Sequence, residues 1–265
     1  PCGLCEATST TQSRDAHSPE QKIASGRRAG EMAGAENVRV LGAWPSPYAM
    51  RPRIALNLKK VEYEFVVETM NPKSELLLKS NPVYKKIPVL IHNGEPVCES
   101  LIIVQYIDEV WSSGQPILPA GPYDRALARF WAAYIDDKWF PALMGIAKAQ
   151  TDEDRASSTE QMLAGLPLLD EAFATCSKGK PFFGGDAVGY LDIALGCHLG
   201  WLRVIEHMYE MQILDEAKST RHLAAWADRF CADEVVKEVM PETEKLVECA
   251  KVLQARWKTA PARGK

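Results

Sequence analysis

The first folded part of the chain alternates between two hydrophobic periods. Residues 38–44 form a short Val/Leu-rich run before a proline, and residues 62–69 alternate polar and apolar side chains; both patterns predict strands. Residues 47–60 repeat apolar side chains every four positions, which predicts a helix. A second short helix is predicted over 73–80, because an Asn-Pro pair follows it and disfavours helical continuation. The order to this point is βαβα.

A predicted hairpin and helix complete this unit. Residues 87–100 place two apolar runs around Asn93-Gly94, the dipeptide that favours a type I′ turn, so the two strands must be antiparallel. A helix is predicted over 100–111, with Ser100 as its N-cap. Its core-facing positions are expected to be Leu101, Val104, Ile107 and Val110. The complete order, βαβαββα over residues 37–111, predicts an α/β, thioredoxin-like domain with a mixed four-stranded sheet.

The rest of the chain shows helical periods only. Residues 112–122 are rich in Gly, Pro and Ser and are interpreted as a linker, and residues 123–258 are expected to form an all-helical C-terminal domain. The region 190–205 is apolar nearly all round, which predicts a buried central helix, with Asp192 bonding unpaired backbone N–H groups. Residues 259–265 are expected to be a flexible tail. The predicted helical segments are 123–140, where Pro141 ends the first, then 160–176, 190–205, 221–230 and 244–257.

The N-terminal segment 1–36 has few large apolar side chains and no periodicity, which predicts a disordered or non-native extension. Met32 stands just before the first strand and is the expected natural start. A transit peptide is the competing interpretation; the acidic residues of the segment, Asp15, Glu20 and Glu31, count against it.

Composition and charge limit the binding partners and the cellular compartment that we expect. The 265 residues carry 31 basic and 35 acidic side chains, a formal net charge of −4, without a basic block. Neither nucleic acid nor a membrane is therefore an expected partner. No apolar run reaches the roughly 20 residues that cross a bilayer. Seven scattered cysteines do not form a disulfide framework, and the C-x-x-C pair Cys2 and Cys5 is interpreted as incidental, so a cytoplasmic location is expected.

Four strings together identify a family resemblance. The chain resembles a glutathione transferase from about residue 38 to 258, and most closely the plant tau class. The resemblance implies conjugation of glutathione to a small apolar electrophile in detoxification and stress metabolism, by a homodimer, with glutathione as co-substrate and no cofactor. The strings are WPSP at 44–47, NPVYKKIPVLIHNG at 81–94, CESLIIVQYIDEVW at 98–111 and FFGGD at 182–186.

Ser46 is the candidate catalytic residue. Pro47 suits the first position of a helix, which makes Ser46 the N-cap, at the positive end of the helix dipole. A free thiol has a pKa of about 8.5, and such an environment lowers it. A lone Ser-Pro pair is more often a plain cap. The resemblance implies that Ser46 donates a hydrogen bond to the glutathione sulfur.

The resemblance also implies five glutathione-binding residues. Glu99 and Ser100 match the pair that binds the γ-glutamyl ammonium and carboxylate. Lys73 and Lys86 match lysines that meet the glycyl carboxylate. Ile87 precedes a proline that matches a cis-proline turn, whose exposed backbone pairs with the cysteinyl part of glutathione. Apart from the resemblance, these charges are ordinary solvated side chains, Ser100 is an ordinary cap, and the proline also suits the start of an edge strand.

Other residues match family positions that lie beside the glutathione site or line the pocket for the second substrate. Arg51 and Asp136 match residues that form a network with the γ-glutamyl site; a surface salt bridge is the alternative. Pro52 departs from the tau pattern, and a proline inside a helix predicts a kink or irregular turn after Ser46. The electrophile pocket is expected between the domains, although aromatic residues at helical spacing are usually core. Its candidate lining residues are Tyr48, Phe140, Met144 and Trp201.

Two other functions remain open at this point. A glutathione-dependent reductase or peroxidase is one, although related reductases carry Cys where this chain has Ser46, and a serine cannot form a mixed disulfide. A non-catalytic carrier of apolar metabolites on the same fold is the other. No metal site is expected, because no histidine has another histidine or a cysteine at i+3 or i+4. No nucleotide cofactor is expected, because G-x-G-x-x-G and P-loop motifs are absent from the sequence.

Overall fold

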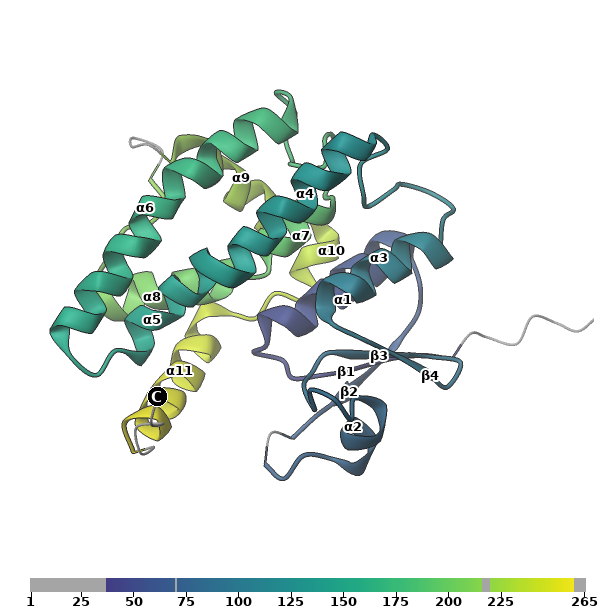
Figure 1. The fold of residues 1–265 in the computed structure, drawn as a ribbon, viewed down its shortest axis with the longest axis horizontal. Coiled ribbons are helices and arrows are strands. Elements are labelled where there is room, and N and C mark those ends of the chain that lie inside the picture. The colour runs from purple at the N-terminus through teal and green to yellow at the C-terminus, as the bar shows by residue number, and fades with distance from the viewer. Residues whose placement is uncertain (1–36, 70, 216–219, 260–265) are drawn as a thin grey trace, which may run out of the picture. The chain divides into compact units, whose positions relative to one another are not determined.

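The computed structural model describes residues 37–69, 71–215 and 220–259 (Figure 1). The expected extension and residues 260–265 of the expected tail lie outside this part of the chain. The described chain starts with the predicted order βαβαββα. Its elements are β1 (Val38–Gly42), α1 (Pro47–Lys59), β2 (Glu64–Val67), α2 (Glu75–Ser80), β3 (Val89–His92), β4 (Glu95–Cys98) and α3 (Ser100–Val110).

The sheet is mixed, as predicted, with strand order β2-β1-β3-β4. β1 pairs with β2 in parallel and with β3 antiparallel, and Val40 lies opposite both Phe65 and Leu90. The β3–β4 hairpin turns at Asn93 and Gly94, whose φ angles of 52° and 91° are the positive values that a type I′ turn requires. The turn residues therefore set the register that pairs β3 with β4.

Strand alternation divides the apolar side chains of the sheet between two faces. Val40 and Leu90 join the cluster that contains Ile54 of α1 and Ile103 of α3. Leu41, Val89 and Ile91 form a second cluster with Leu77 of α2. Accordingly, α1 and α3 lie on one side of the sheet and α2 on the other (Figure 1).

Two details of α1 and α3 differ from the expectation. α1 runs without interruption through the buried Pro52, so the irregular turn expected there is not found. Its packing along α3 and β1 holds the helix although Pro52 has no N–H to donate. In α3, Ile107 is buried but Val110 is 40% exposed. The three-residue spacing drifts around a helix of 3.6 residues per turn, and the buried face passes through Ile103 instead.

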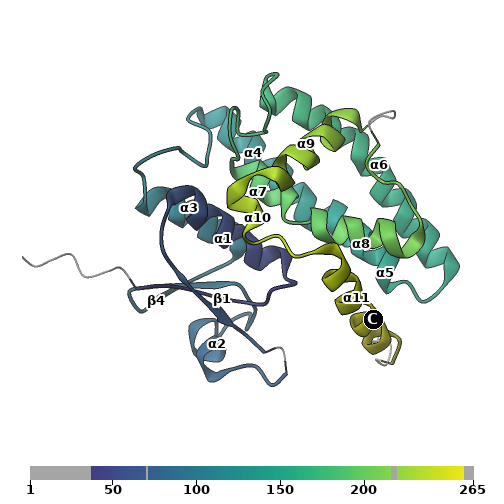
Figure 2. The ribbon, with the colours of Figure 1, turned by 180° about the vertical axis from the view of Figure 1, so that it is seen from behind.

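The remaining described chain is helical (Figures 1 and 2). Pro141 does not end the first of its helices, because the π-helical segment η1 places this proline in the first turn of α5, where a missing N–H costs little. The elements are α4 (Pro122–Tyr134), η1 (Ile135–Trp139), α5 (Phe140–Lys148), α6 (Asp152–Ser177), α7 (Tyr190–Gly196), α8 (Leu199–Tyr209), α9 (Arg221–Ala232), α10 (Glu234–Lys237) and α11 (Thr243–Thr259).

The apolar segment 190–205 is buried, but it forms two helices where one was predicted. The chain breaks at Cys197 and His198, directly after Gly196, where a ring carbon of Phe230 lies only 2.3 Å from the position that a Cβ would occupy. Asp192 has the predicted structural role. Its carboxylate accepts hydrogen bonds from backbone N–H groups and an indole N–H; the donors are Phe183 N, Gly184 N, Gly189 N and Trp226 Nε1, at 2.7–2.9 Å.

Candidate active site

Ser46 is the N-cap of α1, as the sequence predicts. Its backbone is extended, with φ −82° and ψ 115°, and its Oγ accepts a hydrogen bond from Ala49 N at 3.3 Å. The side chain is half-buried. A hydroxyl that accepts from a backbone N–H keeps its own hydrogen, so Ser46 can donate to an anion at the helix N-terminus.

Two other predicted positions, Ile87 and Glu99, lie at the same end of the sheet as Ser46. Leu41 near the end of β1 pairs with Val89 at the start of β3, and Val89 pairs with Cys98 at the end of β4. Sheet pairing therefore brings Ile87, just before β3, and Glu99, just after β4, to the end of the sheet where β1 ends and the chain continues to Ser46. These segments are up to about 50 residues apart in sequence, and the strand register joins them.

Glu99, and not Ser100, is the N-cap of α3. Glu99 is exposed and has φ 69°, an unusual conformation for a residue other than glycine, while Ser100 is the first helical residue. The expectation that Ser100 caps this helix is therefore wrong. Its Oγ is instead turned toward α1, where it accepts a hydrogen bond from Arg51 Nη1 at 3.1 Å.

Arg51 is fully buried and joins Ser100 to the helical part of the chain. Its two Nη atoms donate to the two carboxylate oxygens of Asp136 at 2.7 and 2.6 Å, a bidentate pair. Nη2 also donates to the carbonyl oxygen of Ala194 at 2.8 Å, and Nε contacts the sulfur of Cys197 at 3.2 Å. The structure thus shows the buried network and excludes the surface salt bridge that the sequence left open.

Asp136 is presented by η1, the π-helical segment between α4 and α5. Burial alone would raise the pKa of its carboxyl, but the hydrogen bonds from Arg51 and His198 and the charge of Arg51 outweigh burial and lower the pKa to about 2. Asp136 is therefore ionised across the neutral range and remains paired with Arg51.

His198 was not predicted as a site residue, and it lies in the centre of this network. Its Nε2 is 3.1 Å from Arg51 Nη2, and its ring stacks on Phe140 with centroids 3.7 Å apart. Burial lowers its pKa to about 4, so the imidazole is neutral. In the sequence, His198 lies in an apolar segment with no partner at helical spacing, so only the fold reveals its neighbours.

The predicted electrophile-site aromatics contact one another across α1 and the helical part. Tyr48 packs edge-on against both Phe140 and His198, with centroids 6.0 and 5.7 Å apart. Burial raises the pKa of Tyr48 to about 12, so its hydroxyl stays protonated. Met144 is buried on α5, and Trp201 on α8 donates its indole N–H to the carbonyl oxygen of Pro45 at 2.8 Å.

The lysines and Ile87 lie around the turn before β3. Lys73 donates from Nζ to the carbonyl oxygen of Lys85 at 2.7 Å, which holds it beside this turn. Lys86 is exposed, and its carbonyl oxygen accepts a hydrogen bond from Asn81 Nδ2 at 2.9 Å. The Ile87–Pro88 peptide bond is cis, as the resemblance implied.

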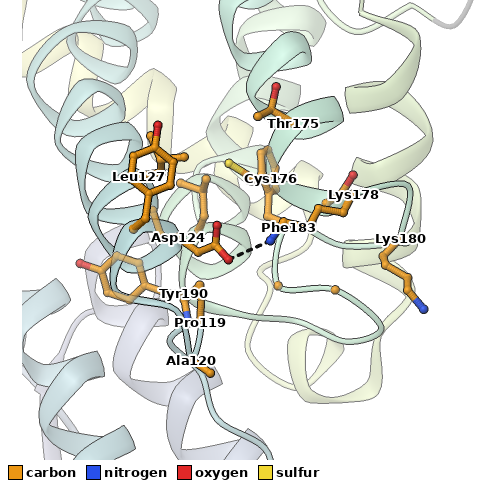
Figure 3. A pocket seen from close by; sticks show the side chains of 16 residues that line it. Pro119, Ala120, Asp124, Leu127, Thr175, Cys176, Lys178, Lys180, Phe183 and Tyr190 are labelled. Carbon is orange, nitrogen blue, oxygen red and sulfur yellow. Dashed lines mark hydrogen bonds and ion pairs between the residues drawn. The ribbon is translucent and has the colours of Figure 1, made fainter.

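A cavity of about 490 Å³ lies away from these residues, and none of the predicted site residues lines it. It is enclosed by the start of α4, the end of α6 and the turn at 183–185 (Figure 3). Its charged groups include an ion pair between Lys178 Nζ and Asp124 Oδ2 at 2.8 Å. Its volume alone does not make it the reaction site, because Ser46 and the Arg51 network lie elsewhere.

Within the described ranges there is no group of three or more His, Cys, Asp or Glu residues that could hold a metal ion. Nor does any described helix combine the length and apolar character that a membrane span requires. The site thus consists of a serine hydroxyl at a helix N-terminus of the thioredoxin-like unit. A buried arginine of the same helix joins this unit to the helical unit.

Comparison with known proteins identifies the class that these features define. The pattern of the glutathione S-transferase N-terminal domain matches residues 36–109, and that of the C-terminal domain matches residues 152–229. Glutathione S-transferase U17 of Arabidopsis thaliana is 62% identical over 216 residues, which cover 81% of this chain and 95% of that protein.

Solved structures identify the class within this family. A tau class glutathione S-transferase from mango, Mangifera indica, is 63% identical, with a TM-score of 0.79 over 82% of this chain and 98% of that one. A rice enzyme solved in complex with glutathione is 33% identical, with a TM-score of 0.77 over 84% of this chain and 99% of that one. The chain therefore belongs to the glutathione S-transferase family, and within it to the tau class.

Proposed function

We propose that this protein joins the sulfur of glutathione to electrophilic apolar compounds and that Ser46 stabilises the thiolate. The observation that carries the proposal is the position of the Ser46 hydroxyl: it caps α1, is half-buried and keeps a hydrogen to donate. A thiolate there is stabilised by this donor and by the helix dipole. The thiol proton passes to solvent, the sulfur forms a bond to carbon, and a leaving group such as halide takes the electron pair of its bond.

The proposed glutathione site extends from Ser46 along the end of the sheet where β1 and β4 end and β3 begins. Glu99 is exposed and available to the γ-glutamyl ammonium. Ser100 is buried, but its hydroxyl, which accepts from Arg51, keeps a hydrogen that it would donate to the adjacent carboxylate. The backbone of Ile87, before the cis proline, would pair with the cysteinyl part in the manner of an added strand. Lys73 and Lys86 would meet the glycyl carboxylate. A relative supports glutathione as the ligand, since the rice enzyme was solved in complex with it.

The buried network around Arg51 also holds part of the proposed glutathione site in place. Arg51 donates to Ser100 Oγ and, through Asp136, is fixed to the helical part. Because Asp136 is ionised, it balances the charge of Arg51, and the bidentate pair holds the other N–H groups of the guanidinium in fixed directions. The proposed reaction uses glutathione as co-substrate and needs no resident cofactor, because thiolate attack requires only the charge stabilisation that these groups supply.

For the second substrate we propose a small apolar electrophile bound beside Tyr48 and Trp201. Tyr48 lies two residues after Ser46, and Trp201 bonds the residue directly before it, which supports a pocket that these aromatic side chains would share with the sulfur.

We also propose a cytoplasmic location. The cysteines within the described ranges are all free, which fits a reducing compartment.

We propose, further, that the protein is a homodimer. Ile102 of α3 and Phe130 of α4 are 56% and 60% exposed, unusual values for large apolar side chains. Arg129 Nη2 donates to Gln105 Oε1 at 2.6 Å, so α3 and α4 are in contact close in sequence to these two side chains. Phe130→Glu is expected to shift the protein toward monomer in analytical ultracentrifugation. Val252→Glu, at an exposed position of α11, serves as the control.

Steady-state conjugation of glutathione to a chromogenic aryl halide tests the catalytic proposal. Ser46→Ala is expected to lower kcat/KM at least tenfold, and Ser46→Thr, which keeps a hydroxyl, to retain more activity. Thr151→Ala is a matched control, since Thr151 caps α6 with its hydroxyl oxygen, accepting from Asp154 N at 3.0 Å. Full activity in Ser46→Ala would contradict the proposal. A silent wild type that binds apolar dyes would favour a carrier.

A further inference from the structure

An indole N–H from the helical part of the chain bonds the backbone directly before Ser46. Trp201 lies on α8, is 6% exposed, and donates from Nε1 to the carbonyl oxygen of Pro45 at 2.8 Å. We infer that Trp201 is a positioning residue for Ser46, acting through this carbonyl in addition to any contact with the electrophile. The inference rests on the proposed role of Ser46 at the glutathione sulfur.

The bond from Trp201 fixes one side of the peptide unit that joins Pro45 to Ser46. That unit is planar, so its orientation is set by its C=O and N–H together. The N–H of Ser46 donates to the carbonyl oxygen of Ala43 at 3.0 Å, and the C=O of Pro45 accepts from Trp201. The φ angle of Ser46, −82°, describes the rotation between this plane and the rest of the residue. A tilt of the plane would therefore redirect the Ser46 side chain.

The other side of Ser46 is fixed by the helix itself. Its carbonyl oxygen accepts from Ala49 N at 3.1 Å and from Met50 N at 3.3 Å, which sets ψ. The flanking residues Pro45 and Pro47 have no N–H, so this segment has few local hydrogen bonds with which to hold its shape. The contact with Trp201 supplies an anchor from outside the segment.

The same helical region also holds α1 at a second point, five residues after Ser46. Arg51 donates to the carbonyl oxygen of Ala194, the residue three positions before Cys197, and contacts the sulfur of Cys197 itself. The α7–α8 region thus fixes Ser46 through Trp201, and Ser100 through Arg51. The two halves of the glutathione site, at the sulfur and at the γ-glutamyl group, take their positions from one rigid part of the helical domain.

Trp201→Phe tests the inference, because it keeps an aromatic ring and removes the N–H. The main readout is the pKa of enzyme-bound glutathione, measured from the ultraviolet absorbance of the thiolate as pH is varied. We expect the pKa of the bound thiol to rise and kcat/KM to fall by about threefold to tenfold, the size of one hydrogen bond. The KM for glutathione should change little, since the residues proposed to bind its two ends are not altered.

A second substitution separates the N–H from the volume of the indole. Replacing Trp201 by β-(3-benzothienyl)alanine changes only the N–H of the ring to sulfur, so it should raise the thiol pKa as Trp201→Phe does. Trp226→Phe is the matched control, because Trp226 is also buried but donates its indole N–H to Asp192, at 2.7 Å, and not to the segment around Ser46. It should lower Tm and leave the pKa of the bound thiol unchanged.

Ser46→Ala in the same titration distinguishes failure of this inference from failure of the proposed function. If Ser46→Ala raises the thiol pKa and both Trp201 variants leave it at the wild-type value, the inference is wrong and the role of Ser46 stands. An equal rise in Trp226→Phe would also overturn it, because general destabilisation would then explain the effect. If Ser46→Ala itself leaves the pKa unchanged, the proposed role of Ser46 fails.

Discussion

Arg51 and Asp136 form a bidentate ion pair, with N–O distances of 2.6 and 2.7 Å, between the first helix of the thioredoxin-like part and the π-helical segment of the helical part. The guanidinium is fully buried and the carboxylate side chain is 24% exposed. A charge so placed stabilises the protein only while its partner is present. The pair therefore couples the stability of the two parts of the chain.

Arg51→Met is expected to lower the free energy of unfolding by about 3–5 kcal/mol, because it leaves the Asp136 carboxylate without its main partner. Urea denaturation followed by circular dichroism measures this. Lys251→Met is the matched control, since Lys251 pairs with Glu248 at 2.7 Å on an exposed surface of α11, and it should cost no more than about 0.5 kcal/mol. Equal losses in the two variants would contradict the importance assigned to the buried pair.

Asp136 is also expected to make stability depend on pH in the acid range. Its pKa in the folded protein is lowered to about 2, below the ordinary value of 3.8. The unfolded chain therefore takes up a proton first as pH falls, and stability present above about pH 4 is lost toward pH 2. The contribution is roughly 2 kcal/mol.

Asp136→Asn removes this titration. The free energy of unfolding of the variant should fall less steeply than that of the wild type between pH 4 and pH 2, in urea titrations at fixed ionic strength. Above pH 5 the variant should be the less stable protein, because an amide cannot accept the two charged hydrogen bonds of Arg51. Parallel pH profiles for the two proteins would show that Asp136 does not carry this dependence.

Glu99→Gln is expected to raise the KM for glutathione about tenfold or more, because it removes the charge proposed to bind the γ-glutamyl ammonium. The effect on kcat should be small, since the thiolate is stabilised at Ser46. Glu95→Gln, at the opposite end of β4, removes an equally exposed carboxylate and should leave KM unchanged. A similar KM in all three proteins would remove Glu99 from the site.

Gly196→Ala is expected to destabilise the protein by about 1–3 kcal/mol, because the new methyl group would overlap a ring carbon of Phe230 at 2.3 Å. Gly200→Ala should cost less, since its methyl group meets the flexible end of Leu246 at 2.9 Å. Thermal unfolding compares the two. Adding Phe230→Leu should recover part of the loss in Gly196→Ala; no recovery would point to a cause other than this overlap.

Features that depend on residues close together in the chain could be predicted from the sequence alone. The Asn93-Gly94 turn, the cap at Ser46 and the order βαβαββα follow from local conformational preference and periodicity, and the structure has each of them. The buried role of Asp192 was also predictable, because an acid in the first turn of an apolar helix has backbone N–H groups within reach. The strings of the tau class added the family, its fold and candidate roles for site residues.

Contacts between groups far apart in the chain could be seen only in the folded protein. Ser100 has the sequence of a cap, yet its hydroxyl faces Arg51, because α3 begins at Ser100 and packs along α1. The π-helical segment that presents Asp136, the break at Cys197 and the placement of His198 arise from packing between helices, which local periodicity does not encode. The bond from Trp201 to Pro45 joins residues 156 positions apart. Such contacts depend on how helices and sheet pack together, and no local pattern in the chain specifies them.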